Sequence, residues 1–130
     1  MNTPEDLLYT KQHAWVKIKG DKAIVGITDD LQELLEFADA IELPKLKDEL
    51  EMDLECVVIN YSGEVYDVPS PLTGRVTKIN HELKYNPELI HSSCYDEGWL
   101  YEMEYDEHDE MEMLYTAGEY ECEIENVPNL

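Results

Sequence analysis

Positive charge is scarce in this sequence. Its 130 residues include 31 Asp and Glu but only nine Lys and Arg, so the formal net charge is -22. Such a chain repels nucleic acid and anionic membrane surfaces, and we expect it to bind neither. The charge favours solubility and fast encounter with partners that carry basic patches, although a solvated acidic surface is the simpler interpretation.

Long apolar runs and paired cysteines are missing as well. No apolar run approaches the ~20 residues that a membrane span requires. The start, "MNTPEDLLYTKQHAW", has no basic region followed by an apolar one, so we expect no signal peptide. Cys56, Cys94 and Cys122 are odd in number and widely spaced, which predicts reduced thiols. We expect a soluble, cytoplasmic protein, and removal of a transit peptide stays open.

Short strands dominate the pattern. Ala14–Lys19 alternates apolar and charged residues, and Gly20-Asp21 joins it to Lys22–Gly26, which predicts a hairpin. Trp99–Tyr105 alternates apolar and acidic residues, as an edge or half-buried strand does. Lys45–Asp53 is expected to be a charged loop. Further strands are expected at Ile41–Pro44, Cys56–Ile59, Val65–Val68 and Arg75–Ile79.

Helices are expected to be few and small. Asp29, with Gln32 three residues later, resembles an N-cap with a capping box and predicts a short amphipathic helix. Asn86–Ile90 predicts one helical turn with proline at its first position. Asp106–Glu125 predicts a C-terminal helix or two short ones interrupted at Gly118. The whole pattern suits one mainly β domain over residues 1–130 whose last residues, 126–130, are frayed.

Motifs for catalysis and metal binding are absent. The sequence has no Gly-x-Ser-x-Gly, no P-loop and no Gly-rich dinucleotide turn. His91 and Cys94 are three residues apart, but without a second pair a surface coincidence is the more frequent explanation. Cys56 lies in an apolar strand, where it is expected to be a small buried hydrophobe and not a nucleophile. We expect the protein to have no catalytic residue and no metal site, and not to be an enzyme.

The stretch "VVINYSGEVYDVPSPLTGRV", Val57–Val76, carries the most information. It predicts two short strands around a tight turn at Ser62-Gly63, followed by a Pro-Leu-Thr-Gly corner. No lysine occurs between Lys47 and Lys78.

Five separated segments occur in a familiar order: "YTKQHAWVKIKGDKAIVGITDDLQELL" (9–35), "IELP" (41–44), "SPLTGRV" (70–76), "NPELI" (86–90) and "GWL" (98–100). Together they resemble the H protein of the glycine cleavage system. The resemblance extends from about Leu8 to Tyr120. It implies a lipoyl-domain-like fold, a flattened barrel of two antiparallel sheets (a barrel-sandwich hybrid) with small flanking helices and a C-terminal helix.

The resemblance also implies a function in glycine catabolism. An H protein is a carrier and not a catalyst: its lipoyl group, amide-linked to a lysine at a hairpin tip, shuttles an aminomethyl group between two enzymes. The implied partners are the pyridoxal-phosphate glycine decarboxylase, the aminomethyltransferase and a lipoate ligase.

This sequence departs from the family where the carrier arm is attached. The spacing to the Ser-Pro corner places Gly63 at the position of the lipoyl lysine, and glycine has no amine. Ala14 replaces the glutamate of a family His-Glu-Trp motif that lines the cavity for the loaded arm, whereas Asp67 keeps the position of another cavity carboxylate. Loss of several such features together points to natural divergence, so no lipoate cofactor is expected.

Three hypotheses follow. The first is an H-protein-like module without lipoate, which binds or regulates partners through Tyr61, Ser62, Gly63 and Glu64. The alternative is a working H protein of glycine decarboxylation whose arm is attached elsewhere, at Lys78 or Lys84. The third reuses the fold for thiol or metal handling through His91 and Cys94.

Overall fold

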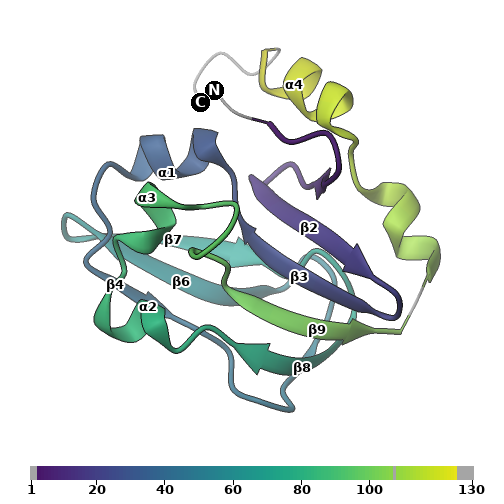
Figure 1. The fold of residues 1–130 in the computed structure, drawn as a ribbon, viewed down its shortest axis with the longest axis horizontal. Coiled ribbons are helices and arrows are strands. Elements are labelled where there is room, and N and C mark those ends of the chain that lie inside the picture. The colour runs from purple at the N-terminus through teal and green to yellow at the C-terminus, as the bar shows by residue number, and fades with distance from the viewer. Residues whose placement is uncertain (1–2, 107, 126–130) are drawn as a thin grey trace.

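The computed structural model describes residues 3–106 and 108–125 of the chain. Among these residues, no helix is long and apolar enough to cross a membrane. The elements, labelled in Figure 1 where there is room, are β1 (Leu8–Tyr9), β2 (Ala14–Lys19), β3 (Lys22–Ile27), α1 (Asp29–Leu35), β4 (Ala40–Glu42), β5 (Glu49–Leu50), β6 (Glu55–Tyr61), β7 (Glu64–Pro69), β8 (Gly74–Ile79), α2 (Glu82–Tyr85), α3 (Leu89–Ser92), β9 (Tyr101–Tyr105), the 3₁₀ helix η1 (His108–Met113) and α4 (Ala117–Glu125).

The larger sheet has six strands in the order β1-β2-β3-β9-β8-β5, all antiparallel to their neighbours. The predicted β2–β3 hairpin is confirmed, with Lys19 opposite Lys22 around the Gly20-Asp21 turn. Short β5 pairs with β8 inside the stretch that was expected to be a charged loop. The sheet therefore contains the strands that were predicted at 14–19, 22–26, 75–79 and 99–105.

Strand β9 is central, so the expectation of an edge or half-buried strand is wrong. It lies between β3 and β8, and four of its five residues are buried. Its acidic residues face cations across the sheet: Glu104 lies opposite Lys22, and Glu102 lies opposite Lys78. Opposite charges on cross-strand neighbours are favourable, which explains why an acidic alternation is tolerated in the middle of the sheet.

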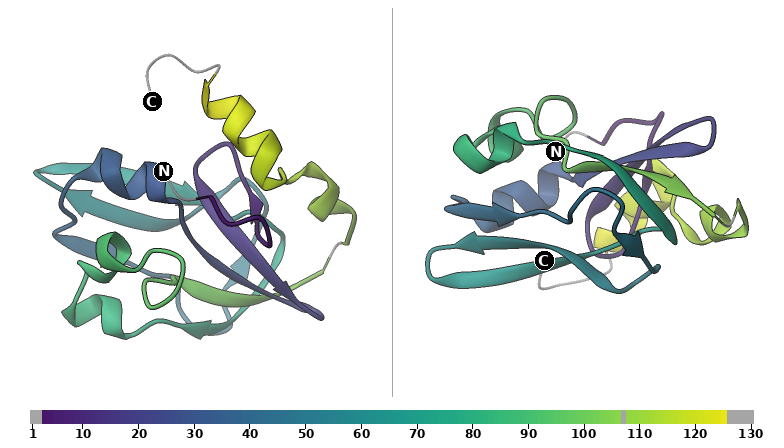
Figure 2. Two further views of the ribbon diagram at one scale, coloured as in Figure 1. Left: turned by 45° about the horizontal axis from the view of Figure 1, so that its top comes forward. Right: turned by 90° about the horizontal axis from the view of Figure 1, so that it is seen from below.

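The smaller sheet consists of β4, β6 and β7 and forms a second layer (Figure 2). Alternate residues of each sheet point between the layers, so that Ile59 and Val68 share a buried core with Val25 and Met103. The expected mainly β, lipoyl-domain-like fold of two antiparallel sheets is confirmed. In the described part of the chain, the two sheets are separate and do not close into one continuous barrel.

Helix α1 begins one residue earlier than the expected cap implies. Its N-cap is Thr28, whose hydroxyl accepts a hydrogen bond from the Leu31 backbone N–H at 3.2 Å. Asp29 is instead the first helical residue, and its carboxylate accepts from the Gln32 side chain at 2.7 Å. The prediction of Asp29 as the cap is therefore wrong, because the adjacent Thr28 offers an equally suitable oxygen one residue upstream.

The segment between β8 and β9 contains two single-turn helices instead of one. The predicted turn at Asn86–Ile90 is displaced to α3, Leu89–Ser92, which has Glu88 and not a proline before it. Helix α2 was not predicted. Its only buried residue is Leu83, so it carries little periodic apolar signal.

Two helical segments, η1 and α4, follow β9. The sequence predicted either one helix or two short ones here, and the structure has two. Gly118 lies inside the first turn of α4 and does not interrupt it, which corrects that expectation. The ring of Tyr120 stacks on Tyr9 of β1, with centroids 4.9 Å apart, and so docks α4 on the edge of the larger sheet. Residues 126–130, expected to be frayed, lie outside the described residues.

Candidate functional site

The β6–β7 hairpin ends in a two-residue turn. Tyr61 pairs with Glu64, and Ser62 and Gly63 connect them. Both turn residues have positive φ angles, 48° at Ser62 and 82° at Gly63. Two successive positive φ angles define a type I′ turn, whose twist suits antiparallel strands and which favours glycine. The predicted turn is confirmed, and Gly63 has a conformational role at its tip.

Three hydrogen bonds hold the tip against the connection between α1 and β4. The Asp39 carboxylate accepts from the Ser62 backbone N–H at 3.0 Å, and the Asp39 N–H donates to the Asn60 carbonyl at 2.7 Å. The Asn60 side chain in turn donates to the Glu42 carboxylate at 3.3 Å. The sequence gives no hint of Asp39, because this contact joins residues 23 positions apart.

The tip projects into open space. A Cβ atom built on Gly63 would meet no other atom within 4 Å. Ser62, Gly63 and Glu64 are exposed, while Tyr61 is half-buried and packs against the core. A side chain at position 63 would therefore reach solvent and any docked protein. In this chain the tip presents a hydroxyl, a carboxylate and backbone, and it presents no amine.

The two lysines considered as alternative attachment points lie elsewhere. Lys78 is exposed on β8, in the larger sheet. Lys84 is exposed in α2, where its ammonium lies 5.9 Å from the centroid of the Tyr85 ring. Neither belongs to the β6–β7 hairpin, so neither occupies the turn that presents the arm in the resemblance.

The two predicted cavity positions have different surroundings. Ala14, at the start of β2, has no exposed surface and belongs to the core. Asp67 is exposed and lies opposite Val58 of β6. Its neighbour Val68 is buried, so strand alternation points Asp67 to the outer side of the smaller sheet. The structure does not bring Ala14 and Asp67 onto one surface.

Tyr66 faces the interior beside Asp67 and was not singled out from the sequence. Its hydroxyl donates to the Gln12 carbonyl at 3.2 Å, which links β7 to the loop that precedes Ala14. Burial, followed by the nearby Tyr61, raises the pKa of Tyr66. Strand alternation could have predicted this orientation, because it places Tyr66 on the same side of β7 as Val68 and opposite to Val65 and Asp67. The side chain occupies space between the hairpin and the start of β2.

A buried polar network lies next to Ala14, where α4 meets β2. Nδ1 of His13 and the Tyr120 hydroxyl are 2.6 Å apart, and the Tyr120 hydroxyl is 2.9 Å from Oγ1 of Thr28. His13 has a positive φ of 66°. Burial lowers the pKa of His13, which favours the neutral ring. This network ties the C-terminal helix to the β2 start and to the N-cap of α1.

The pair His91 and Cys94 is engaged in structural contacts. Nε2 of His91 accepts from the Ala38 N–H at 3.0 Å, and Nδ1 lies 3.0 Å from Oε1 of Gln32. Both ring nitrogens are thus occupied. Burial raises the pKa of the Cys94 thiol to about 12, so the thiolate that binds metals is disfavoured. This geometry weighs against thiol or metal chemistry at the pair.

Cys56 is half-buried in β6. Its thiol lies 3.3 Å from the Tyr101 hydroxyl and 3.5 Å from the Val68 carbonyl. Burial raises its pKa to about 11, and the Tyr101 contact opposes this shift. A thiol in this state is a poor nucleophile at neutral pH, as the sequence led us to expect.

Two exposed apolar side chains are close in sequence to residues that form or contact the hairpin tip. Phe37, two residues before Asp39, is 61% exposed, and Val65, directly after Glu64, is 60% exposed. Exposed apolar side chains become part of a binding surface where they form a contiguous patch. The tip therefore combines a fixed turn with apolar neighbours and carboxylates.

Comparisons with known proteins agree on one family. The family model described as glycine cleavage H-protein matches residues 7–127. The chain is similar to the glycine cleavage system H protein of Halothermothrix orenii, with 39% identity over 127 residues that cover 98% of this chain and 99% of the relative. It is also similar to the glycine cleavage system H protein of Bacillus licheniformis, with 36% identity over 121 residues that cover 93% of this chain and 95% of the relative.

A solved structure gives the same result for the fold. The crystal structure of a glycine cleavage system H protein from Mycobacterium marinum superposes with a TM-score of 0.83 at 27% sequence identity. The match covers 94% of this chain and 98% of that one.

Proposed function

This chain belongs to the glycine cleavage H-protein family, and from that premise we propose that it is a member without a lipoyl arm, which binds or regulates partner proteins. The family is one of carriers and not of enzymes. One observation supports the proposal: the hairpin turn that the spacing aligns with the family's lipoyl lysine holds Gly63, and neither flanking strand contains a lysine. Lipoate needs a primary amine for its amide bond, and this tip offers none.

The surroundings of the tip support the same conclusion. The sheltering cavity of the family needs room and carboxylates near the start of β2. Here Ala14 is buried without a polar group, and Tyr66 spans from β7 to the Gln12 carbonyl. Asp67, the remaining family carboxylate, is exposed on the strand next to Val68. These features favour a hairpin that serves as a recognition surface.

The partners that best fit this surface are proteins that dock on H-protein hairpins. We propose the aminomethyltransferase, the glycine decarboxylase or a lipoate ligase, met in the cytoplasm. The docking surface would comprise Tyr61, Ser62, Gly63 and Glu64, with the exposed Phe37 and Val65 beside them. Their apolar area would supply affinity, and the carboxylates would orient a partner with a basic patch.

Binding of purified partners tests the proposal. The chain is titrated at low salt into the aminomethyltransferase, the glycine decarboxylase and a lipoate ligase, and heats of binding are measured. Phe37→Asp should weaken binding at least tenfold, since it places a charge in the apolar contact. Leu54→Asp is the matched control, because Leu54 is 57% exposed but precedes β6 at the end of the strand away from the tip.

Two results would overturn the proposed docking. One is the absence of binding to all three proteins. The other is an equal loss of affinity for the Phe37 and Leu54 variants, which would show that the tip is not the contact.

A second candidate is a working aminomethyl carrier with its arm on Lys78 or Lys84. The exposure of both side chains favours it, because a ligase can reach their amines. Co-expression with a lipoate ligase, followed by peptide mass mapping of the wild type, Lys78→Arg and Lys84→Arg, distinguishes the candidates. An adduct that disappears with one of these substitutions identifies a carrier. Unmodified peptides at both positions support the arm-free proposal.

A further inference from the structure

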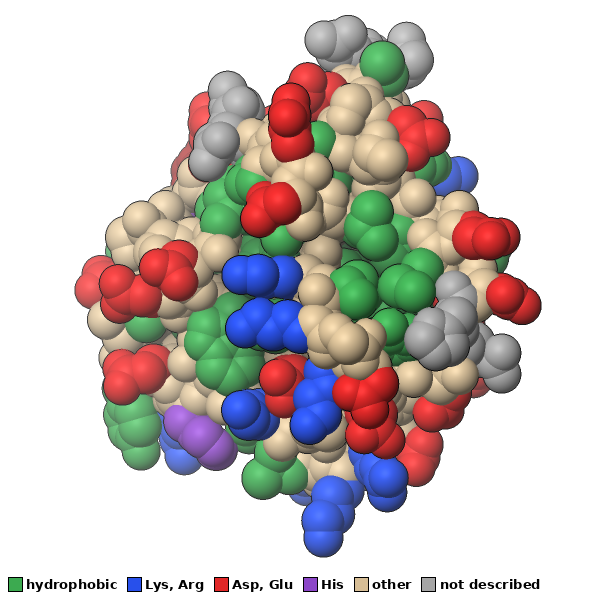
Figure 3. Space-filling view, turned by 45° about the vertical axis from the view of Figure 1, so that its right-hand side comes forward, with side chains coloured by type: hydrophobic (Ala, Val, Ile, Leu, Met, Phe, Trp, Pro, Cys, Tyr) green, Lys and Arg blue, Asp and Glu red, His purple; other side chains and the backbone are tan. Residues whose placement is uncertain are grey.

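The outer face of the larger sheet gathers the few cations of the chain. Figure 3 shows blue Lys and Arg side chains side by side in the middle and lower part of one face, with red carboxylates mostly around them. Strand alternation, with the bulge between Val76 and Lys78 in β8, places five of the nine cationic side chains outward on β2, β3 and β8, namely Lys17, Lys19, Lys22, Arg75 and Lys78. In a chain with a net charge of -22, a concentration of cations on one face suggests that this face has a function.

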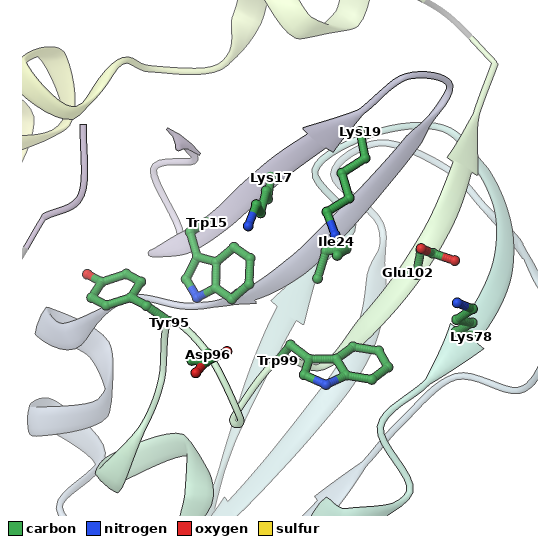
Figure 4. Close-up of a pocket in the computed structure, with 9 residues that line it drawn as sticks. All are labelled: Trp15, Lys17, Lys19, Ile24, Lys78, Tyr95, Asp96, Trp99 and Glu102. Carbon is green, nitrogen blue, oxygen red and sulfur yellow. The ribbon is translucent and has the colours of Figure 1, made fainter. Parts of the chain in front are cut away.

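A groove of about 260 Å³ lies within this face (Figure 4). Lys17 and Lys19 approach it from β2, and Lys78 approaches it from β8 on the opposite side. The half-buried side chain of Ile24 lies between these lysines, and the indoles of Trp15 and Trp99 form the apolar walls of the groove. The groove thus combines an apolar surface with three ammonium groups.

The Trp15 wall is fixed by tight packing. Its indole lies directly on Gly26, where a Cβ atom would come within 2.3 Å of the ring. Its Nε1–H donates to the Cys94 carbonyl at 2.8 Å. Trp15 is only 2% exposed, so the ring is held in one orientation.

The backbone that carries Trp99 is anchored by the buried Asn80. The Asn80 side-chain amide donates to the Trp99 carbonyl at 2.7 Å and to the Glu97 carbonyl at 2.8 Å. This holds the 97–99 segment against the end of β8. The Trp15 indole and the backbone that carries Trp99 are therefore positioned before a ligand arrives, which lowers the entropic cost of binding.

The carboxylates of the groove balance only part of its positive charge, and one of them, Glu102, is the cross-strand neighbour of Lys78. Two acidic residues, Asp96 and Glu102, line the same groove. The Glu102 carboxylate is 8% exposed and accepts a hydrogen bond from the Thr77 hydroxyl at 2.8 Å. In the described part of the chain, no ion pair joins Lys17, Lys19 or Lys78 to a carboxylate. Three ammonium groups against two carboxylates leave the groove with a local positive charge.

We propose that this groove binds a small organic anion. Its apolar or aromatic body would lie on Ile24 between the two indoles, and its carboxylate or phosphate would meet the ammonium groups of the lysines. The volume is below the range of about 300–1,000 Å³ that is common for drug-sized ligands, which points to a small metabolite. The proposal is independent of whether the hairpin carries an arm.

Charge distribution favours a small anion over an acidic protein. In Figure 3, most carboxylates on this face lie above the cationic patch and to its two sides. A broad acidic partner would meet these carboxylates, whereas a small anion stays within the positive region. Screening over about 8 Å at physiological salt separates the patch from most of the remaining negative charge.

The two tryptophans of the chain make the test direct, because both line the groove. The indole N–H resonances of ¹⁵N-labelled protein are followed while benzoate, phenyl phosphate or neutral benzyl alcohol is added. We expect saturable shifts of both resonances with at least one anion, weaker binding at high salt, and at least tenfold weaker binding of benzyl alcohol. The two anions distinguish carboxylate from phosphate ligands.

Matched charge variants complete the experiment. Lys17→Gln with Lys78→Gln should weaken anion binding by up to about fivefold for each ammonium removed. Lys11→Gln with Lys45→Gln changes the charge equally outside the groove and should leave affinity unchanged. The absence of saturable shifts, equal binding of benzyl alcohol, or equal effects of the two double variants would overturn the proposal. Saturable binding of an acidic peptide without binding of either small anion would also overturn it.

Discussion

The hairpin tip and the groove on the larger sheet use glycine and lysine in opposite ways. At the tip, Gly63 serves the turn, its missing side chain faces open space, and no amine is present. At the groove, Gly26 leaves space for the indole of Trp15, which forms one wall. Three lysines also line the groove. The tip is thus only loosely tied to the fold, while the groove is embedded in it.

Under the proposal of an arm-free member, this difference explains how the fold persists. The tip contributes turn geometry and a few exposed hydrogen bonds, so its chemistry can change at small cost in stability. The groove rests on close packing between strands, where change affects the core. The predictions below compare the two regions, in order of decreasing effect.

Adding one methyl group should have very different effects in the two regions. Gly26→Ala places a carbon 2.3 Å from the fixed Trp15 ring and should lower the free energy of unfolding by about 3 kcal/mol. Gly63→Ala meets no atom, and only its positive φ should cost about 1 kcal/mol. Urea denaturation of both variants measures the difference. Equal losses would contradict the assignment of packing to one glycine and conformation to the other.

The buried network beside Ala14 should be the next most sensitive feature. Tyr120→Phe removes the hydroxyl shared by His13 and Thr28 and should cost about 1–2 kcal/mol of unfolding free energy. Tyr85→Phe is the control, because Tyr85 is 82% exposed. Equal stability of the two variants would show that the network does not hold α4 in place.

Acid should loosen the contact between α3 and the connection that follows α1. Burial lowers the pKa of His91 below its ordinary 6.5, while its Gln32 contact opposes the shift. The neutral ring is therefore preferred in the folded state, and its contribution to stability is present above pH 6.5. It is lost progressively as pH falls below that value and through the folded pKa. Protonation prevents Nε2 from accepting the Ala38 N–H.

Unfolding free energies measured between neutral and acidic pH isolate this effect. The difference between the wild type and His91→Gln should shrink as pH falls, because the wild type loses the contribution and the variant never had it. The exposed His81→Gln is the control and should give a constant difference. A gap that widens in acid would mean that the sign is reversed.

The smallest effect is expected at the tip itself. Asp39→Ala removes the acceptor of the Ser62 N–H and, at an exposed site, should cost about 0.5 kcal/mol. Hydrogen exchange at the Ser62 amide should accelerate. Glu64→Ala removes a carboxylate from the same tip without removing this acceptor and should leave the exchange unchanged. A global loss of protection would instead assign Asp39 a role in the whole fold.

The predictable parts of the fold were those encoded by local patterns. Alternation indicated most strands, and Ser62-Gly63 indicated the turn that the structure contains. The sequence indicated Asp29 as the cap of α1, but the adjacent Thr28 also carries a side-chain oxygen, and only the three-dimensional geometry shows that Thr28 is the cap. The central place of β9 was hidden because the cations opposite its glutamates come from other strands.

The candidate site shows the same limit. The turn at Ser62-Gly63 could be predicted from residues within one hairpin, which are close together in the sequence. The Asp39 support, the inward Tyr66 and the groove between β2 and β8 all join residues far apart in the chain. Such contacts leave no periodic signal, and they became visible only once the strands were placed.

The most direct measurement is the intact mass of the full chain after co-expression with a lipoate ligase in lipoate-supplemented cells. A lipoylated H protein made in the same cells serves as the positive control, and Gly63→Lys tests whether an amine at the tip suffices for modification. The account predicts the unmodified mass for the wild-type chain. A wild-type mass increased by one lipoyl group would contradict it.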